Sequence, residues 1–410
     1  MSATRVSGTV PGDATIFRTD IYLSHIARVL LLSLIQQFAE VNLMKLNRIH
    51  SKSFFPPLVV FVIYLGIMLG LFMAGGGKYY SLQRALMQWD GQHYLSIARD
   101  GYVKFPCSFD RTYICGNVGW FPFYPIVAST IALSGLSINA AMLVTSWAAF
   151  AIALVLLYQL LLARFDRRVA LTSLIALLLY PGSFYFLTSF PYALYLLLSI
   201  TTFRLLHHGR YGWLPLPVGL LAITYPSGIV IGLPLLWILV AQWRSLQVSQ
   251  RLWLSGSLAS IGLTLFLYGC FYWWKFGDFF LYSRFQGQSY YAHEPAFPLT
   301  VIYETLTVLP ITQPVPLMLL FAGLITAVFF TRRLPAPWQI YLFGLLLFTP
   351  TFGTTDCYYR HLVVAFPLFV LVGLGVRSKW RMAFIGVYVI AAIVLLLTVY
   401  LPAYKMGQLM

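Results

Sequence analysis

The chain has 410 residues, of which 60% are hydrophobic and only 9% are charged. Because soluble proteins carry about 25% charged residues, this composition excludes a soluble domain and predicts a polytopic membrane protein. Lipid offers no partners to backbone polar groups, so an all-α bundle is expected. The net charge of +16 does not indicate nucleic-acid binding, since the basic residues lie in short clusters between apolar runs, as membrane-topology signals do.

The chain is predicted to consist of a short N-terminal segment, 1–53, and a single transmembrane domain, 54–410. The N-terminal segment lacks the order of basic start, apolar core and small-residue cleavage site that marks a signal peptide. Its apolar stretch 26–46 is interrupted by charged and amide side chains. This pattern favours an amphipathic helix at the cytoplasmic membrane interface.

Apolar runs of about 20 residues, long enough to cross the hydrocarbon as helices, follow one another through the transmembrane domain. They predict about 10 to 12 transmembrane helices. The runs cover approximately 54–74, 121–137, 139–163, 169–187, 190–206, 213–241, 252–273, 306–330, 338–352, 361–376 and 382–402.

Basic clusters between these runs are predicted to face the cytoplasm. Because both ends of 213–241 are basic, this run is predicted to be two short helices that meet near Tyr225-Pro226, where proline disfavours helix in the residue before it. When the membrane crossings between basic clusters are counted in this way, the two runs between 121 and 163 are predicted to cross the membrane only once together. The clusters are Arg164/Arg167/Arg168, Arg204/Arg210, Arg244/Arg251, Arg332/Arg333 and Arg377/Lys379/Arg381.

Three stretches then share the non-cytoplasmic face, namely 75–120, 274–300 and 353–360. They contain most of the acidic residues, so the active site is expected on this face. It would be the outer side of the plasma membrane in a prokaryote and the endoplasmic reticulum lumen in a eukaryote.

The most informative stretch is Trp89-Asp90-Gly91-Gln92-His93-Tyr94, in the first outer loop. Gly101 can end a short surface helix over about 91–100, with Asp90 at its N-cap, a role worth about 1 kcal/mol. Alternatively, the Asp90 carboxylate is a general base that accepts a proton from an attacking sugar hydroxyl. Both interpretations are open at this point.

Aromatic side chains surround this aspartate in the sequence. They can offer flat partners to the apolar faces of sugars, but the aromatic belt at a membrane interface uses the same residue types. His93 can orient the base, bind the acceptor or simply be a satisfied surface histidine. The aromatic candidates for lining the substrate are Trp89, Tyr94, Trp120 and Tyr124.

In this order, the motifs resemble the family of the second mannosyltransferase of GPI-anchor assembly and its prokaryotic relatives (GPI mannosyltransferase II-like), within the C-type superfamily of membrane glycosyltransferases. The resemblance spans nearly the whole chain. The matching elements are Trp89-Asp90 through Gly101-Tyr102, Phe121-Pro122-Phe123-Tyr124-Pro125, Phe276-Gly277-Asp278 with Gln286, and Tyr359-Arg360-His361 before Phe366-Pro367-Leu368.

The resemblance implies a C-type glycosyltransferase fold with surface helices in the first outer loop, 75–120. It also implies an inverting transfer of a hexose, typically mannose, from a polyprenyl-phosphate-linked donor to a hydroxyl of a lipid-linked or exported acceptor. Asp90 matches the family's loop aspartate, the base. The sequence departs from the family's pattern at two places. The family tends to have an acid where Phe190-Pro191-Tyr192 stands here, and it often has arginine before proline where Tyr225 stands here.

A polyprenyl-phosphate leaving group needs cationic or N–H donors, because negative charge grows on its oxygens as the glycosidic bond breaks. Arg360 offers the planar fork that suits phosphate, although it can also be a snorkelling arginine. The candidates for binding the donor phosphate are Arg360, His361, Arg284 and Lys275, and Asp278 and Gln286 are further candidates for lining the substrate.

Cys107 and Cys115 are the only close cysteine pair, and both fall in the predicted outer loop, where an oxidising compartment permits a disulfide. No Asp-x-Asp or His-x-x-x-His spacing occurs in an outer loop, so no metal or other cofactor is expected. The missing Asp-x-Asp also argues against a nucleotide-sugar donor.

Two other classes compete with the glycosyltransferase. A secondary transporter would explain the split run near Pro226, but transporters often show two equivalent halves, and none is visible here. A flippase or a noncatalytic partner in glycan assembly is the other alternative.

Overall fold

The computed structural model describes residues 53–74, 81–289, 293–307, 333–353, 358–375 and 381–402. The predicted interfacial helix 26–46, most of the run 306–330 and the outer residues 354–357 lie outside them. The chain divides into two units, Met1–Ser53 and Phe54–Met410. Only the second unit is described below.

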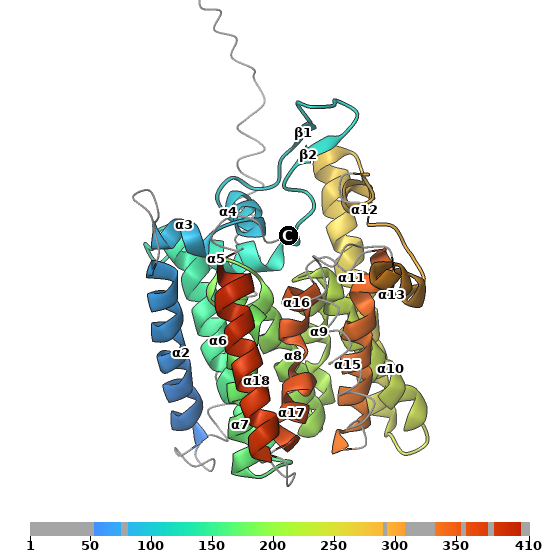
Figure 1. Cartoon of the computed structure of the whole chain (residues 1–410). Helices are drawn as coiled ribbons and strands as arrows, with labels where there is room; N and C mark the ends of the chain where they lie inside the picture. The colour runs from blue at the N-terminus through green and yellow to red at the C-terminus, as the bar shows by residue number, and fades with distance from the viewer. Residues whose placement is uncertain are drawn as a thin grey trace, which may run out of the picture. The chain divides into compact units, whose positions relative to one another are not determined.

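Within the described residues, the second unit consists of helices and one small β-hairpin (Figure 1). The all-α architecture expected from the composition is therefore confirmed. The elements, with η marking 3-10 or π helices, are α2 (Phe55–Met73), α3 (Leu82–Leu86), α4 (Asp90–Asp100), β1 (Lys104–Pro106), β2 (Ile114–Gly116), α5 (Phe123–Ala132), α6 (Ile138–Leu162), α7 (Arg167–Leu179), η2 (Pro181–Leu187), α8 (Tyr192–His207), η3 (Tyr211–Trp213), α9 (Pro215–Ala222), η4 (Pro226–Ile231), α10 (Gly232–Ala241), α11 (Val248–Phe276), α12 (Leu281–Gln286), α13 (Pro298–Thr307), α15 (Ala336–Phe348), η6 (Thr349–Phe352), α16 (Tyr358–His361), η7 (Leu362–Val364), α17 (Phe366–Leu374), α18 (Arg381–Leu395) and η9 (Leu396–Tyr400).

Three described helices are long and apolar enough to cross a membrane by themselves, namely α2, α6 and α11. The pair α7 and η2 would make a fourth, but it bends by 85° where Pro181 begins η2. The other apolar helices in the described ranges are shorter. The sequence prediction of about 10 to 12 spans counted several of these short pieces as full crossings.

The structure resolves which part of 121–163 crosses. Helix α6 has 25 residues, or about 37 Å, whereas α5 has 10 residues, or about 15 Å, at 1.5 Å per residue. Since the hydrocarbon core is about 30 Å thick, only α6 is long enough. Helix α5 packs on α4 of the first outer loop, where the Ser129 hydroxyl donates to the carbonyl of Ala98 at 2.9 Å, and its first residue Phe123 donates a backbone hydrogen bond to Ile223 at 3.1 Å.

The predicted break in 213–241 is confirmed. Helix α9 ends at Ala222 and η4 begins at Pro226. Tyr225 between them is extended, with φ −159° and ψ 151°, as steric contact with a following proline favours. The broken backbone turns the Tyr225 side chain toward the site described below.

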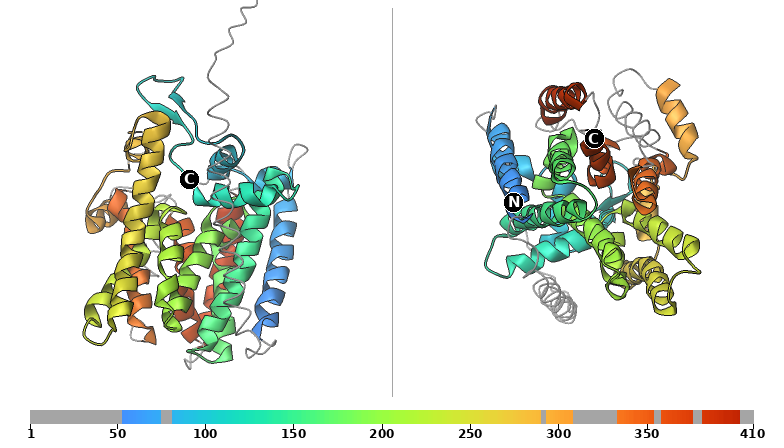
Figure 2. Two further views of the ribbon diagram at one scale, coloured as in Figure 1. Left: turned by 180° about the vertical axis from the view of Figure 1, so that it is seen from behind. Right: turned by 90° about the horizontal axis from the view of Figure 1, so that it is seen from below.

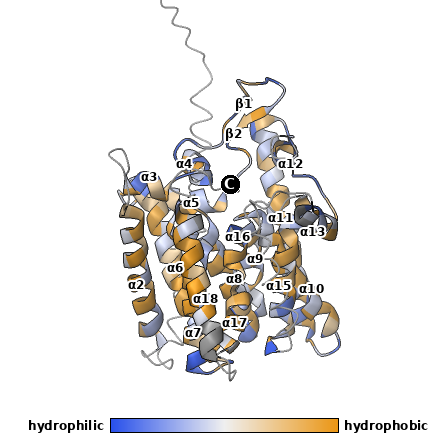
Figure 3. Cartoon of the chain, viewed as in Figure 1, coloured by the Kyte–Doolittle hydropathy of each residue, from blue (hydrophilic) through white to orange (hydrophobic). Residues whose placement is uncertain are grey.

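Two of the predicted basic clusters, those of Arg164 and Arg204, lie together at one end of the bundle, whereas Arg332, Arg377 and Lys379 lie outside the described residues. The Arg164 guanidinium lies 3.4 Å from Nδ1 of His207, and Arg204 donates to Oε1 of Gln159 at 2.8 Å. Arg164 also lies 5.7 Å from the ring centroid of Trp338. Figure 3 shows hydrophilic residues at this lower end and around α3, α4 and α12, with hydrophobic helices between.

The opposite end, called the loop end, is formed by α4, the β1–β2 hairpin, α12 and the end of α11 (Figures 1 and 2). The hairpin is antiparallel, with Phe105 opposite Cys115. The hydroxyl of Tyr272 donates to the carbonyl of Val118 at 2.8 Å, and that of Tyr268 donates to the carbonyl of Trp120 at 3.1 Å. These bonds fix the first outer loop on α11.

Candidate functional site

The start of α4 is set by a strained turn at Trp89. Trp89 has φ 58° and ψ −132°, and it is the only non-glycine residue with positive φ among the described residues. The N–H of Gly91 donates to the carbonyl of Gln88 at 3.0 Å, so Trp89 holds a turn position that normally requires glycine. Such a conformation costs about 1–3 kcal/mol and often marks a functional site.

Because of this turn, Asp90 is the first residue of α4 and Trp89 takes the N-cap position, with no side-chain cap bond. The interpretation of Asp90 as an N-cap residue is therefore wrong. Its carboxylate still lies at the positive end of the helix dipole, which favours an anion, but it does not bond the backbone of its own helix.

The Asp90 carboxylate is instead paired with Arg360. The distance between Oδ2 of Asp90 and Nη2 of Arg360 is 2.9 Å, and the two side chains are 25% and 14% exposed, respectively. The Arg360 guanidinium also lies 5.8 Å from the ring centroid of Phe190. Arg360 thus points into the protein rather than snorkelling outward, and the predicted base and the first phosphate candidate lie together.

A close backbone contact holds Asp90 in this place. A Cβ added at Gly91 would lie 2.4 Å from Oγ of Ser189, so any larger residue there would have to displace the Ser189 hydroxyl. The N–H of Ser189 donates to the carbonyl of Leu86 at 2.9 Å. The start of α4 is therefore packed directly against the segment that precedes Phe190.

A chain of hydroxyl and imidazole groups lies next to the ion pair. The Tyr192 hydroxyl donates to that of Tyr225 at 3.1 Å, and the Tyr225 hydroxyl lies 2.7 Å from Nε2 of His361. The other ring nitrogen of His361 lies 3.0 Å from Oγ1 of Thr349. The start of α8, the break before η4 and the η6–α16 region thus meet beside Arg360, and both nitrogens of the predicted phosphate candidate His361 are engaged.

The second outer loop, residues 274–300, reaches the same region. Gln286 donates to the carbonyl of Gly119 at 2.8 Å, and its Oε1 lies 2.8 Å from Nδ1 of His293. Arg360 and His293 both lie near enough to His361 for their charges to affect its imidazole. Gln286, predicted to line the substrate, therefore links the first outer loop to the second.

The predicted aromatic residues divide into two groups. Trp120 stacks on His93, with ring centroids 3.5 Å apart and planes inclined by 11°. Tyr94 and Tyr124 are buried, with their rings edge to face at 5.6 Å, and the Tyr124 hydroxyl donates to the carbonyl of Met142 at 2.9 Å. We therefore assign Tyr94 and Tyr124 to the packing of α4 on α5 and α6, not to a sugar platform.

His93 lies one helical turn after Asp90 and is partly buried. Burial lowers the pKa of the His93 imidazole below its ordinary value, and the charge of Asp90 opposes this shift. The indole Nε1 of Trp89, on the other side of Asp90, is buried and has no hydrogen-bond partner in the described part of the chain.

Three other candidates lie away from the ion pair. Asp278 forms an ion pair with Arg284 and accepts a hydrogen bond from the N–H of Phe280 at 3.0 Å. These contacts give Asp278 and Arg284 a local role at the start of α12. Lys275 is exposed at the end of α11, 5.9 Å from the ring centroid of Phe276.

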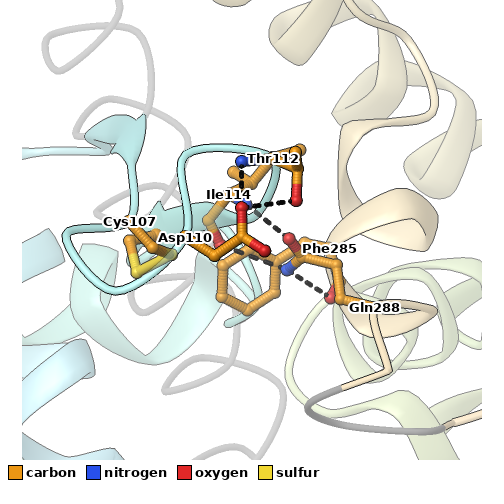
Figure 4. The surroundings of a disulfide bond; sticks show 7 residues. Cys107, Asp110, Thr112, Ile114, Phe285 and Gln288 are labelled. Carbon is orange, nitrogen blue, oxygen red and sulfur yellow. Dashed lines mark hydrogen bonds between the residues drawn. A yellow bond between two sulfur atoms is a disulfide. The ribbon is translucent and has the colours of Figure 1, made fainter.

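Cys107 and Cys115 form the disulfide considered from the sequence. Gln288 bonds both the N–H and the carbonyl of Ile114, so that the segment directly after α12 holds the hairpin (Figure 4). A cavity of about 450 Å³ lies under the hairpin. Its lining includes His93, Phe105, Asn117, Phe285 and the disulfide.

Sequence reasoning missed Phe190, Tyr192, Tyr225 and Thr349 as parts of the site. A signal for three of them was present, because Phe190, Tyr192 and Tyr225 fall at the two places where the sequence departs from the pattern of the family that its motifs resemble. Thr349 gave no signal, since it follows an apolar run like many other threonines.

No family model and no curated protein matches the chain. Among solved structures, it is similar to the oligosaccharyltransferase of Archaeoglobus fulgidus in the apo form (12% identity, TM-score 0.44) and tethered with an acceptor peptide (13% identity, TM-score 0.44). Each comparison covers 86% of this chain and about 55% of the archaeal one, so the chain spans about half the length of those structures.

Proposed function

We propose that the chain is an inverting, polyprenyl-phosphate-sugar-dependent glycosyltransferase with Asp90 as its general base. The observation that carries the proposal is the Asp90–Arg360 ion pair. In it the carboxylate is bonded to the arginine expected to bind the donor phosphate, and it does not cap its own helix. Acids near apolar spans are expensive and usually functional. The motif order supports a hexose, with mannose as the expected sugar.

The proposed reaction needs a base beside the acceptor hydroxyl and a cation beside the donor phosphate. The acceptor hydroxyl gives its proton to the Asp90 carboxylate as its oxygen attacks the anomeric carbon of the donor. The bond from this carbon to the phosphate oxygen breaks on the opposite side, which inverts the configuration. Arg360 binds the departing polyprenyl phosphate, whose negative charge increases as the bond breaks. Asp90 and Arg360 are already neighbours.

The broken span that favoured a transporter has a role in this proposal. Its break turns the Tyr225 hydroxyl toward His361 at 2.7 Å, so the break serves the site beside Arg360. The active site is proposed to face the non-cytoplasmic side, a proposal supported by the position of Arg164 and Arg204 at the other end of the bundle, since basic residues favour the cytoplasmic face.

The test is incubation of the purified protein with polyprenyl-phosphate-mannose or polyprenyl-phosphate-glucose and membrane lipid acceptors, followed by mass spectrometry. A hexose-sized mass increase on an acceptor lipid, absent in Asp90→Asn, is the expected result. If no sugar is transferred but labelled polyprenyl-phosphate lipid moves between leaflets of proteoliposomes, the flippase alternative replaces the proposal.

A further inference from the structure

The Asp90–Arg360 ion pair engages two groups that the proposed reaction needs for other partners. Arg360 has to bind the donor phosphate, and the Asp90 carboxylate has to accept the acceptor proton. In the structure each group holds the other, at 2.9 Å. We infer, resting on the proposed function, that the donor phosphate displaces Asp90 from Arg360 and that the base is released only when a donor is bound.

Charge balance at the site requires an exchange. A polyprenyl-phosphate sugar is an anion, as is the carboxylate, and one guanidinium cannot neutralise both. Arg360 is only 14% exposed, and in partly buried surroundings two nearby anions repel strongly. His361 cannot readily substitute for Arg360, because both its ring nitrogens are engaged, one with Tyr225 and one with Thr349.

The carboxylate is able to leave. Asp90 makes no bond to the backbone of α4, and among the described residues its Oδ1 has no hydrogen bond or ion pair. Rotation of the side chain therefore breaks one interaction only. After leaving Arg360, the carboxylate remains at the N-terminal end of α4, where the helix dipole continues to stabilise a negative charge.

The backbone, in contrast, is fixed. The strained turn at Trp89 and the contact between Gly91 and Ser189 hold the first turn of α4 in place. The exchange is therefore a change in the Asp90 side-chain rotamer, without movement of the loop. It makes catalysis ordered, because an acceptor that arrives before the donor meets a carboxylate already bonded to Arg360.

The exchange predicts an unusual effect of removing the carboxylate. Farnesyl phosphate, a short polyprenyl phosphate without sugar, is titrated into the full chain in detergent, with farnesol as the probe for lipid binding alone. Asp90→Asn is expected to bind farnesyl phosphate about five- to tenfold more tightly than the wild type, because the Asp90 carboxylate no longer competes with the phosphate for Arg360. Asp90→Ser, a second variant without the charge, is expected to show the same gain.

Two controls identify the source of the gain. Asp100→Asn removes an exposed acid of the same helix, which is paired with Arg99, and should leave the affinity unchanged. Arg360→Ala should weaken binding, and Asp90→Asn/Arg360→Ala should bind no better than Arg360→Ala. A gain that persists without Arg360 would show general repulsion between anions and overturn the exchange.

The outcomes separate the exchange from the proposed function. If Asp90→Asn and Asp90→Ser retain the wild-type melting temperature but bind farnesyl phosphate equally or more weakly, while Arg360→Ala loses binding, the exchange is wrong and the phosphate role of Arg360 stands. If neither the wild type nor any variant prefers farnesyl phosphate to farnesol, the exchange and the proposed phosphate-binding function are both wrong.

Discussion

Nη2 of Arg360 lies 2.9 Å from Oδ2 of Asp90, and this contact joins the first outer loop to the short helix α16 near the end of the chain. The first prediction concerns the carboxylate. Asp90→Asn keeps the shape of the side chain but cannot accept the acceptor proton. Transfer should fall by about 10²- to 10⁴-fold, the usual contribution of a general base. Single-turnover transfer measures it, with Asp100→Asn as the control that retains activity.

The second prediction concerns the cation. Arg360→Ala should raise KM for the polyprenyl-phosphate sugar by about tenfold or more, since hydrogen bonds to charged groups contribute about 1.5–3 kcal/mol. KM for the acceptor should change less. Arg284→Ala, which removes the partner of Asp278, is the matched comparison and should affect donor KM less than Arg360→Ala. Equal rises in both KM values for Arg360→Ala would argue against a phosphate role.

A third prediction concerns pH and stability. Burial lowers the pKa of His93 from its ordinary value of 6.5, so the unfolded chain binds a proton at higher pH than the folded chain does. The stability that comes from a neutral His93 is present above pH 6.5 and is lost as the pH falls below it toward the lower folded pKa.

His93→Phe, which can keep a ring against Trp120, should make the melting temperature less sensitive to acid. Melting curves between neutral and acidic pH, recorded for both proteins in the same detergent, measure the difference. An identical acid dependence in the two proteins would contradict this role of His93.

The fourth prediction concerns the hairpin. Replacing both Cys107 and Cys115 by serine should cost about 2–3 kcal/mol of unfolding free energy at most, because the closed loop is short. The effect should be local, since Gln288, just after α12, still holds Ile114. Limited proteolysis should cut first between the two positions. Cys270→Ser, in α11, should leave the cleavage pattern unchanged.

The fifth prediction concerns metal ions. Among the residues that the structure describes, no three His, Cys, Asp or Glu side chains come together in a group that could hold a metal ion. Transfer should therefore persist in excess chelator. Complete loss of activity in chelator, restored by Mg²⁺ or Mn²⁺, would refute the expectation that transfer is independent of metal ions.

Local signals in the sequence predicted the framework well. Proline chemistry at Tyr225-Pro226 and the basic ends of 213–241 were enough to place the break between α9 and η4. The sequence could not decide between α5 and α6, because both are apolar. The decisive property was the uninterrupted length of α6.

The site was harder to predict, because its contacts join residues far apart in the chain. Asp90 was found through its unfavourable setting, but its pairing with Arg360 depends on the turn at Trp89, for which tryptophan gives no local signal. Tyr192 and Tyr225 stood out in the sequence only as departures from the pattern it resembles, and their contact could not be predicted, since only the fold brings their hydroxyl groups together.

The long helix α11 also relates the site to the depth of the bilayer. Its exposed tryptophans Trp253 and Trp273 are separated by about 30 Å along the helix axis, the thickness of the hydrocarbon, and tryptophans of this kind settle at the two headgroup layers. Tyr268, which holds the carbonyl of Trp120, lies about 7.5 Å inward of Trp273. The first outer loop is thereby anchored about 7.5 Å inside the headgroup layer, at a depth that a polyprenyl phosphate would reach without leaving the membrane.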